Sequence, residues 1–315
     1  MDLEKDYTHE IIKLAPDYEG EAIAVLTSCR QNTGKRKSVL YLHGFIDYFY
    51  HPHVGEAFLR QNYDFHALDL RKYGRALLPH QHPNYCKSLN EYFEEISIAI
   101  KKIKTSNEPL YILGHSTGGL IACSYLNDGN ERHLVDGLIL NSPFFDINLP
   151  KFQKVLSVYS AKVISKFSDF GKVNGVLSPA YPKSLHKDYY GEWDFNLNWK
   201  PIHGFPTYFK WLVAIVDAQK NLFNSKIEQP ILLMHSSSSL RLSKYDERAK
   251  RNDIVLNIED MKRVGPFIGD NIEFVSIKNA LHDIFLSQKL LRNLGFLKMF
   301  DWLDKTEKRI QTKIN

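Results

Sequence analysis

Short apolar runs separated by polar turns recur along the whole chain. Residues 9–14 and 21–27 are two such runs, and Pro16 and Gly20 between them predict an opening hairpin. Further apolar runs lie at residues 38–43, 65–70, 109–113, 135–140, 230–234 and 272–277. Runs of this length that are bounded by turn residues are typical of strands buried in a sheet.

Helical patterns lie between several of these runs. Ser88 and Glu91 match a capping box, and apolar residues at helical spacing follow it up to Ile103. Residues 117–126 predict a second helix, and leucines with Phe300 on one face predict another at the end of the chain. Strands that alternate with helices predict an α/β fold with a mostly parallel sheet flanked by helices, and ligands are expected at the carboxyl ends of the strands.

This alternation is interrupted between residues 149 and 225. That segment has two helical patterns, one around Tyr159 and one that opens at Pro206, and no clear sheet strand. We therefore expect a core domain made of residues 1–148 and 226–315, with residues 149–225 inserted as a helical cap.

Composition places the chain among ordinary globular proteins. It has 315 residues, of which 43% are hydrophobic and 24% are charged, enough for one large α/β domain with an insertion. The formal charge is +5, and the only basic clusters, at residues 35–37 and 101–102, are short and are expected to be solvated loop or helix-end charges. Neither nucleic acid nor an anionic membrane is therefore expected as a partner.

Cysteine usage and the N-terminus indicate the compartment. The three cysteines are far apart and form no C-x-x-C pair, which predicts neither disulfides nor a zinc site and is typical of a reducing environment. Residues 1–10 are charged and lack an apolar signal segment, and no later run approaches ~18 apolar residues. A cytoplasmic protein without stable membrane insertion is expected, while the pattern does not address its oligomeric state.

The run at 109–113 leads into Gly114-His115-Ser116-Thr117-Gly118, and a helical pattern follows at once. Strand, Gly-x-Ser-x-Gly and helix together are the signature of a nucleophile elbow. In that turn, the glycines leave room for a tight backbone and the serine oxygen is lifted out of the sheet. Ser116 is therefore the candidate nucleophile.

A serine nucleophile needs a base, and the base needs a carboxylate to orient it. His282 follows the last predicted strand, where its ring can reach back over the sheet edge to Ser116. This agrees with the order of serine, acid and histidine that accompanies an elbow of this kind. His282 is the candidate base.

The carboxylate has four candidates. Asp253 is favoured because it lies after the strand at 230–234 and before a short apolar run, although the polar stretch 236–251 intervenes. The alternatives are Asp146, Asp246 and Asp283. Asp283 adjoins the histidine in sequence and is poorly placed to reach the ring of its own neighbour.

Two backbone N–H groups are needed to hold a developing oxyanion. One is expected from Thr117, directly after the nucleophile. The other is expected from Phe45, in the turn His43-Gly44-Phe45 that ends the strand at 38–43.

No metal or cofactor is expected. His51, His53, His80 and His82 lack the spacing and the carboxylate of a metal site, and they are expected to be loop histidines. Aromatic residues of the predicted cap could line an acyl pocket or form the cap's own core. They are Trp193, Phe195, Trp199, Phe205, Tyr208 and Trp211.

Together these residues resemble the α/β-hydrolase superfamily over nearly the whole chain. The resemblance is closest to the branch of hydrolases similar to monoacylglycerol lipase, lysophospholipase and serine aminopeptidase. It rests on five pieces of sequence: 42–45, Asp69-Leu70-Arg71 with Gly74-Arg75, 114–119, Asn252-Asp253 with Val255, and His282-Asp283. The resemblance implies a helical cap after the sixth strand and hydrolysis of a small-molecule carboxylic ester through an acyl-enzyme.

Other activities stay open. The first is an aminopeptidase or amidase of the same fold, in which Asp188, Glu192 and Asp194 would receive a free amino group. Transfer of the acyl group to an alcohol is the second. A ligand-binding module without catalysis is the third, although each role of the triad has a candidate residue.

Overall fold

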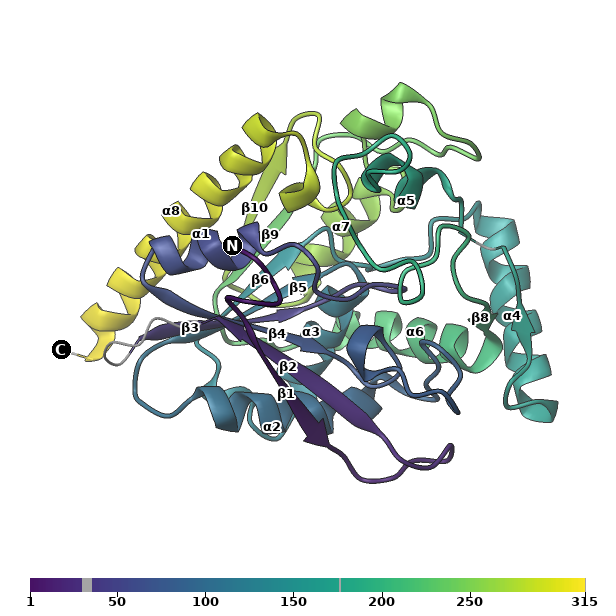
Figure 1. Cartoon of the computed structure of the whole chain (residues 1–315), viewed down its shortest axis with the longest axis horizontal. Coiled ribbons are helices and arrows are strands. Elements are labelled where there is room, and N and C mark those ends of the chain that lie inside the picture. Colours follow the sequence, from purple (N-terminus) through teal and green to yellow (C-terminus); the bar gives the residue numbers. More distant parts are fainter. Residues whose placement is uncertain (30–35, 176, 315) are drawn as a thin grey trace.

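The computed structural model of the chain describes residues 1–29, 36–175 and 177–314. A single eight-stranded sheet runs through the protein in the order β1-β2-β4-β3-β5-β6-β9-β10 (Figure 1). Its strands are β1 (Thr8–Lys13), β2 (Ile23–Cys29), β3 (Lys37–Leu42), β4 (Tyr63–Asp69), β5 (Leu110–His115), β6 (Gly137–Asn141), β9 (Ile231–Ser236) and β10 (Ile272–Ile277). β2 pairs antiparallel with β1 and β4, and the other neighbours are parallel, which confirms the predicted sheet.

Both faces of the sheet are covered by helices. Successive strand residues point to opposite faces, so in β3 Leu40 and Leu42 pack into one apolar cluster, while Val39 and Tyr41 pack into another. The first cluster includes α2 (Phe93–Ile103), α3 (Thr117–Asp128), α6 (Phe209–Asn221) and α7 (Ile258–Val264). The second includes α1 (His53–Arg60) and α8 (Lys289–Ile314). The α/β-hydrolase fold predicted from the sequence is confirmed.

The segment 149–225 contains α4 (Lys151–Phe167), α5 (Ala180–Leu185) and α6. Its described residues add no strand to the eight-stranded sheet, but β7 (Lys172–Val173) and β8 (Thr207–Tyr208) pair in a small separate sheet. A two-residue pairing is too short to show a period in the sequence, so the sequence does not predict it. Because Thr207 and Tyr208 are extended, α6 begins at Phe209 and not at Pro206 as predicted. The division into core and cap stays a prediction.

Several local expectations need correction. α1 and α7 were not predicted, and His53 opens α1 and does not lie in a loop. The capping box at Ser88 opens a 3-10 turn (Leu89–Tyr92), after which α2 begins. Of the basic cluster, Lys35 lies outside the described residues together with Gly34, whereas Lys37 begins β3 and its Nζ lies 2.6 Å from Glu307 Oε2. That lysine is therefore not a solvated loop charge.

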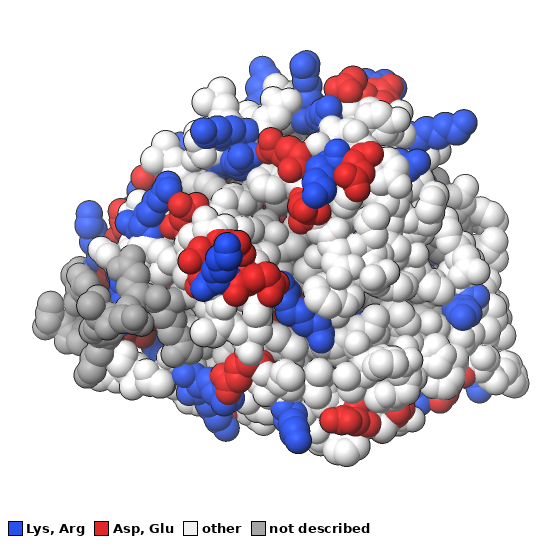
Figure 2. Space-filling model, in the orientation of Figure 1, with Lys and Arg blue, Asp and Glu red and all other residues white. Residues whose placement is uncertain are grey.

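Figure 2 shows positive and negative side chains close together on this face of the molecule, without a large area of one sign. The right-hand part of this view, where Figure 1 places α4, β8 and α6, carries few charges. Throughout the described ranges, no helix combines the length and the apolar character that crossing a bilayer requires.

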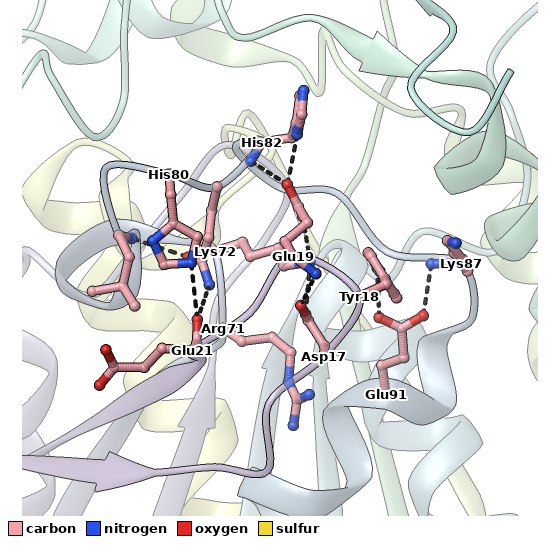
Figure 3. Close-up of polar contacts among 12 residues, drawn as sticks. Asp17, Tyr18, Glu19, Glu21, Arg71, Lys72, His80, His82, Lys87 and Glu91 are labelled. Carbon is pink, nitrogen blue, oxygen red and sulfur yellow. Dashed lines mark hydrogen bonds and ion pairs between the residues drawn. The ribbon is translucent and has the colours of Figure 1, made fainter.

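A buried ion-pair cluster ties the β1–β2 hairpin to the loop after β4 (Figure 3). Lys72 is fully buried, with Nζ 2.8 Å from Asp17 and 2.6 Å from Glu19, and it lies 4.2 Å from the centre of the Tyr18 ring. Burial favours the neutral form of Glu19, but hydrogen bonds from Lys72 and His82 outweigh it and hold its pKa below the usual value. A carboxyl with a lowered pKa adds stability above its unfolded-state pKa, and that stability is lost as the pH falls through the folded-state pKa.

We expect Lys72→Met to lower the free energy of unfolding by about 3–5 kcal/mol, because two buried carboxylates lose their shared cation. Lys87→Met is the matched control. Lys87 Nζ lies at the same 4.2 Å distance from the Tyr18 ring and pairs with Asp169, but its side chain is 34% exposed. The control should cost at most about 1 kcal/mol. Urea unfolding of both variants measures the difference, and equal losses would contradict the role of the buried charge.

Candidate active site

Ser116 occupies a strained turn between β5 and α3. Its φ is 53° and its ψ is −116°, a left-handed conformation that costs of order 1–3 kcal/mol for a residue with a side chain. A Cβ at Gly118 would lie 2.2 Å from the Leu42 carbonyl oxygen, and one at Gly114 would lie 2.7 Å from the Gly118 oxygen. Both positions therefore require glycine, which is the physical reason for the motif.

Asp253 and His282 are joined by a hydrogen bond. The His282 Nδ1 donates to Asp253 Oδ2 at 2.8 Å, and both side chains are buried. Asp253 Oδ1 accepts from the backbone N–H groups of Val255 and Leu256 at 2.9 and 2.8 Å. The carboxylate is thus held by its own loop, and in the neutral imidazole the proton on Nδ1 leaves Nε2 as the basic nitrogen.

The three alternative carboxylates have other partners. Asp146 pairs with Lys154 and Arg263. Asp246 caps the turn at 247–251 and pairs with Arg248. Asp283 Oδ1 accepts from Asn141 Nδ2 at 2.8 Å. Of the four candidates, Asp253 is the one hydrogen-bonded to the His282 ring.

The histidine loop lies beside the elbow. The ring centres of His282 and His115 are 4.9 Å apart, and His115 directly precedes Ser116. Within the described ranges, no hydrogen bond joins Ser116 Oγ to His282. Hydrogen bonds between catalytic groups are often long or absent in the free enzyme and form when substrate binds.

The two expected N–H donors flank the serine. A Cβ built on Gly44 would lie 3.2 Å from Ser116 Cβ, which puts the turn before Phe45 against the nucleophile. Thr117 is the first residue of α3, so its N–H has no partner in the helical ladder. The Phe45 ring stacks on Trp211 of α6, with ring centres 4.0 Å apart.

Side chains from the segment 149–225 cover this region. Tyr181 of α5 meets the His282 ring edge-on at 5.5 Å, and its hydroxyl accepts from Asp283 N at 3.1 Å. Lys200 Nζ donates to Asp47 Oδ1 at 2.5 Å. Burial favours the neutral form of Asp47, but the Lys200 ammonium outweighs it and lowers the pKa. Ser116 itself is buried beneath these side chains, with 8% of its surface exposed.

The aromatic residues predicted in the cap mostly pack elsewhere. Trp193 stacks on His53 and donates to the Leu286 carbonyl, whereas Phe195 packs on Tyr50 and Trp199 on Tyr48. The sequence reasoning missed Asn141, Asp47, His115, Lys200 and Tyr181 as neighbours of the site. The only available signal was that Asn141, Asp47 and His115 end or follow predicted strands.

The histidines that could have suggested a metal site have other partners or neighbours, and of these described residues only His51 and His53 lie near each other, with ring centres 6.0 Å apart. His82 binds Glu19, and His53 bonds the Phe285 carbonyl oxygen. Over the residues that the structure describes, there is no group of three or more His, Cys, Asp or Glu side chains arranged to hold a metal.

Known proteins share this architecture. Residues 33–243 match the hydrolase family described as "Serine aminopeptidase, S33". Phospholipase YtpA of Bacillus subtilis is 33% identical over 76 residues, which are 24% of this chain and 29% of that protein, so the chain spans under a third of this relative.

Two solved structures show the same fold. The first is a soluble variant of monoglyceride lipase from Saccharomyces cerevisiae in complex with a substrate analog, with a TM-score of 0.70 and 19% identity. That match covers 95% of this chain and 97% of the other. The esterase EaEST from Exiguobacterium antarcticum matches with a TM-score of 0.56 and 16% identity, over 91% and 97% of the two chains.

Proposed function

Because the chain belongs to the serine aminopeptidase S33 family of α/β-hydrolases, we propose that it is a serine hydrolase of carboxylic esters with Ser116 as nucleophile. One observation carries the proposal: a buried carboxylate, Asp253, binds the ring of His282 beside the strained serine turn. The order of the three residues in the chain is the one this fold uses. Residues 149–225 act as the cap over them.

In the proposed reaction, Ser116 Oγ attacks the ester carbonyl carbon while His282 Nε2 takes the hydroxyl proton. The N–H groups of Phe45 and Thr117 hold the resulting oxyanion. Collapse of the intermediate breaks the bond to the alcohol, which leaves with the proton from His282. Water then gives a proton to His282 and attacks the acyl-enzyme, and the carboxylic acid departs as Ser116 regains its proton.

A fluorophosphonate probe tests the nucleophile directly. We expect one adduct per chain, on the peptide that contains Ser116, identified by mass spectrometry after digestion. His282→Ala should slow the labelling at least about 100-fold, since the base that activates the serine is removed. No adduct, or an adduct on a different serine, would overturn the proposed function and favour a ligand-binding module.

Short-chain esters, monoacylglycerols and lysophospholipids are the proposed substrates, and one helix of the segment 149–225 favours the two lipid classes among them. The support comes from α4, whose buried residues Ala161 and Ser165 lie on one side. Its opposite side is an exposed apolar stripe at helical spacing. The stripe consists of Phe152, Val155, Leu156, Tyr159, Val163 and Phe167, and Phe152 and Phe167 are 78% and 87% exposed.

We expect Phe152→Ser, Tyr159→Ser and Phe167→Ser combined to reduce hydrolysis of an emulsified monoacylglycerol by about 10-fold. Apolar area that faces water is available to contact aggregated lipid. Hydrolysis of a dissolved p-nitrophenyl acetate should stay unchanged, because the substituted side chains point away from the site. An equal loss on both substrates, or no loss on the emulsion, would contradict the lipid assignment.

Two of the three acidic residues that could receive a peptide's amino group are paired with cations of the chain, whereas Asp188 Oδ2 lies 3.7 Å from His186 Nδ1. Glu192 forms an ion pair with Arg292, and Asp194 Oδ2 lies 2.6 Å from Lys187 Nζ. Their charges are thus compensated within the chain, which favours esters over aminopeptidase substrates. Ester and anilide substrates of the same acyl group separate the two activities, and added alcohol that diverts product to a new ester would reveal acyl transfer.

A further inference from the structure

Asn141, the last residue of β6, contacts both arms of the proposed active site. Its main-chain oxygen accepts the N–H of Ser116 at 3.0 Å and His115 Nδ1 at 3.1 Å. Its side-chain Nδ2 donates to Asp283 Oδ1 at 2.8 Å, and its Oδ1 accepts from Ile284 N at 3.2 Å. One fully buried residue therefore joins the nucleophile turn to the loop that follows His282.

Asp283 completes this connection from the other side. Its Oδ1 also accepts from Phe285 N at 2.9 Å, so one oxygen binds both Asn141 and its own loop. Its buried Oδ2 has no hydrogen-bond partner among the described residues, and His115 Nε2 lies 3.9 Å away. Burial favours the neutral acid, but His115, His51 and the bond from Asn141 outweigh it and lower the pKa of Asp283.

We propose that Asn141 and Asp283 are positioning residues that hold the His282 loop in register with Ser116. The inference rests on the proposed function, because it assigns these residues to the alignment of that same base and nucleophile. An amide suits position 141 because it offers a donor to the carboxylate and an acceptor to the Ile284 N–H from one planar group. A misplacement of about 1 Å between reacting groups can cost 100-fold in rate.

The first test is Asn141→Leu, measured on an ester substrate. We expect kcat to fall by about 10- to 100-fold while KM changes less than about 2-fold, because alignment changes and substrate contacts do not. Fluorophosphonate labelling of Ser116 should slow in proportion to kcat. A kcat within 2-fold of the parent protein would overturn the inference.

Asn127→Leu is the matched control for the loss of a side-chain amide. Asn127 lies in α3, where its Nδ2 bonds the Cys123 carbonyl and Ser225 Oγ at 2.9 and 2.8 Å. We expect this variant to unfold at a lower urea concentration than the parent protein and to keep the kcat of the parent protein. If kcat falls as much in Asn127→Leu as in Asn141→Leu, a general loss of stability explains both results and the inference is wrong.

Variants of Asp283 give a second, independent readout, which also decides the matter if Asn141→Leu does not fold. Asp283→Asn keeps an oxygen for Asn141 and Phe285, so kcat should stay within about 3-fold, whereas Asp283→Ala should match Asn141→Leu. The double variant Asn141→Leu/Asp283→Ala should have a kcat close to that of either single variant, since both substitutions remove the same shared hydrogen bond. Additive losses, or an equal loss in Asp283→Asn, would overturn the inference. Absence of Ser116 labelling in the parent protein would instead overturn the proposed function.

Discussion

Ser116→Ala is expected to lower kcat for a p-nitrophenyl ester by about 10⁴- to 10⁶-fold, because it removes the nucleophilic oxygen. The fold should persist. Serine and alanine share the Cβ that is strained at a φ of 53°, and none of the residues in the described ranges makes a hydrogen bond to Ser116 Oγ. The measurement is kcat of purified protein, with the urea midpoint as the check on folding.

Ser142→Ala is the matched control for this substitution. Ser142 follows β6 as Ser116 follows β5, has a φ of 49° and is fully buried, and its Oγ has no hydrogen-bond partner among the described residues. It therefore shares with Ser116 a buried position at the end of a parallel strand and a positive φ, but it does not lie in the Gly-x-Ser-x-Gly turn. We expect Ser142→Ala to keep kcat within about 2-fold. Comparable activity in the two variants would show that Ser116 is not the nucleophile.

Asp253→Asn is expected to lower kcat by about 10⁴-fold through the tautomer of His282. The amide oxygen at position 253 has to accept from the N–H groups of Val255 and Leu256, as Oδ1 now does. The amide NH₂ then faces His282 Nδ1 and can only donate to it. The imidazole proton is forced to Nε2, the nitrogen that would have to receive the proton of Ser116.

Asp146→Asn is the control that separates the candidate acids. Asp146 carries the same charge as Asp253, but it forms ion pairs with Lys154 and Arg263. Its loss should leave kcat within about 2-fold and cost no more than about 1 kcal/mol of stability. A large loss in Asp146→Asn with an active Asp253→Asn would transfer the role of the acid to Asp146.

The strands and the elbow could be predicted because the pattern that identifies each of them lies within a few consecutive residues. Buried parallel strands are continuous apolar runs, so β3, β5, β6 and β9 were located to within a few residues. The elbow depends on glycines within two positions of Ser116, where a Cβ would meet backbone atoms. Short elements were harder to predict. The β7–β8 pair has too few residues to show a period, and α1, α5 and α7 are shorter than the 11–18 residues over which a helical period is read.

The partners of the site residues could not be read from the chain in the same way. Three of the four candidate aspartates lie between Ser116 and His282, as the fold requires, and Asp283 follows the histidine. The hydrogen bond to His282 distinguishes Asp253 from the other three. The bond between Asn141 and Asp283 spans 142 positions. Spacing along a sequence carries no information on which distant groups meet once the sheet is assembled.

By itself, the sequence determined the α/β class, the place of Ser116 at a strand-to-helix turn and the downstream position of His282. The first two follow from local backbone constraints, namely apolar periodicity and the steric requirement for glycine, and the third follows from the order of residues along the chain. Only the tertiary structure decided that Asp253 is the carboxylate bound to His282, that Tyr181 and Trp211 cover the site, and that Asn141 joins its two arms. Those contacts depend on how the ends of separate parallel strands and the helices α5 and α6 come together at one edge of the sheet, which is a property of the packed chain.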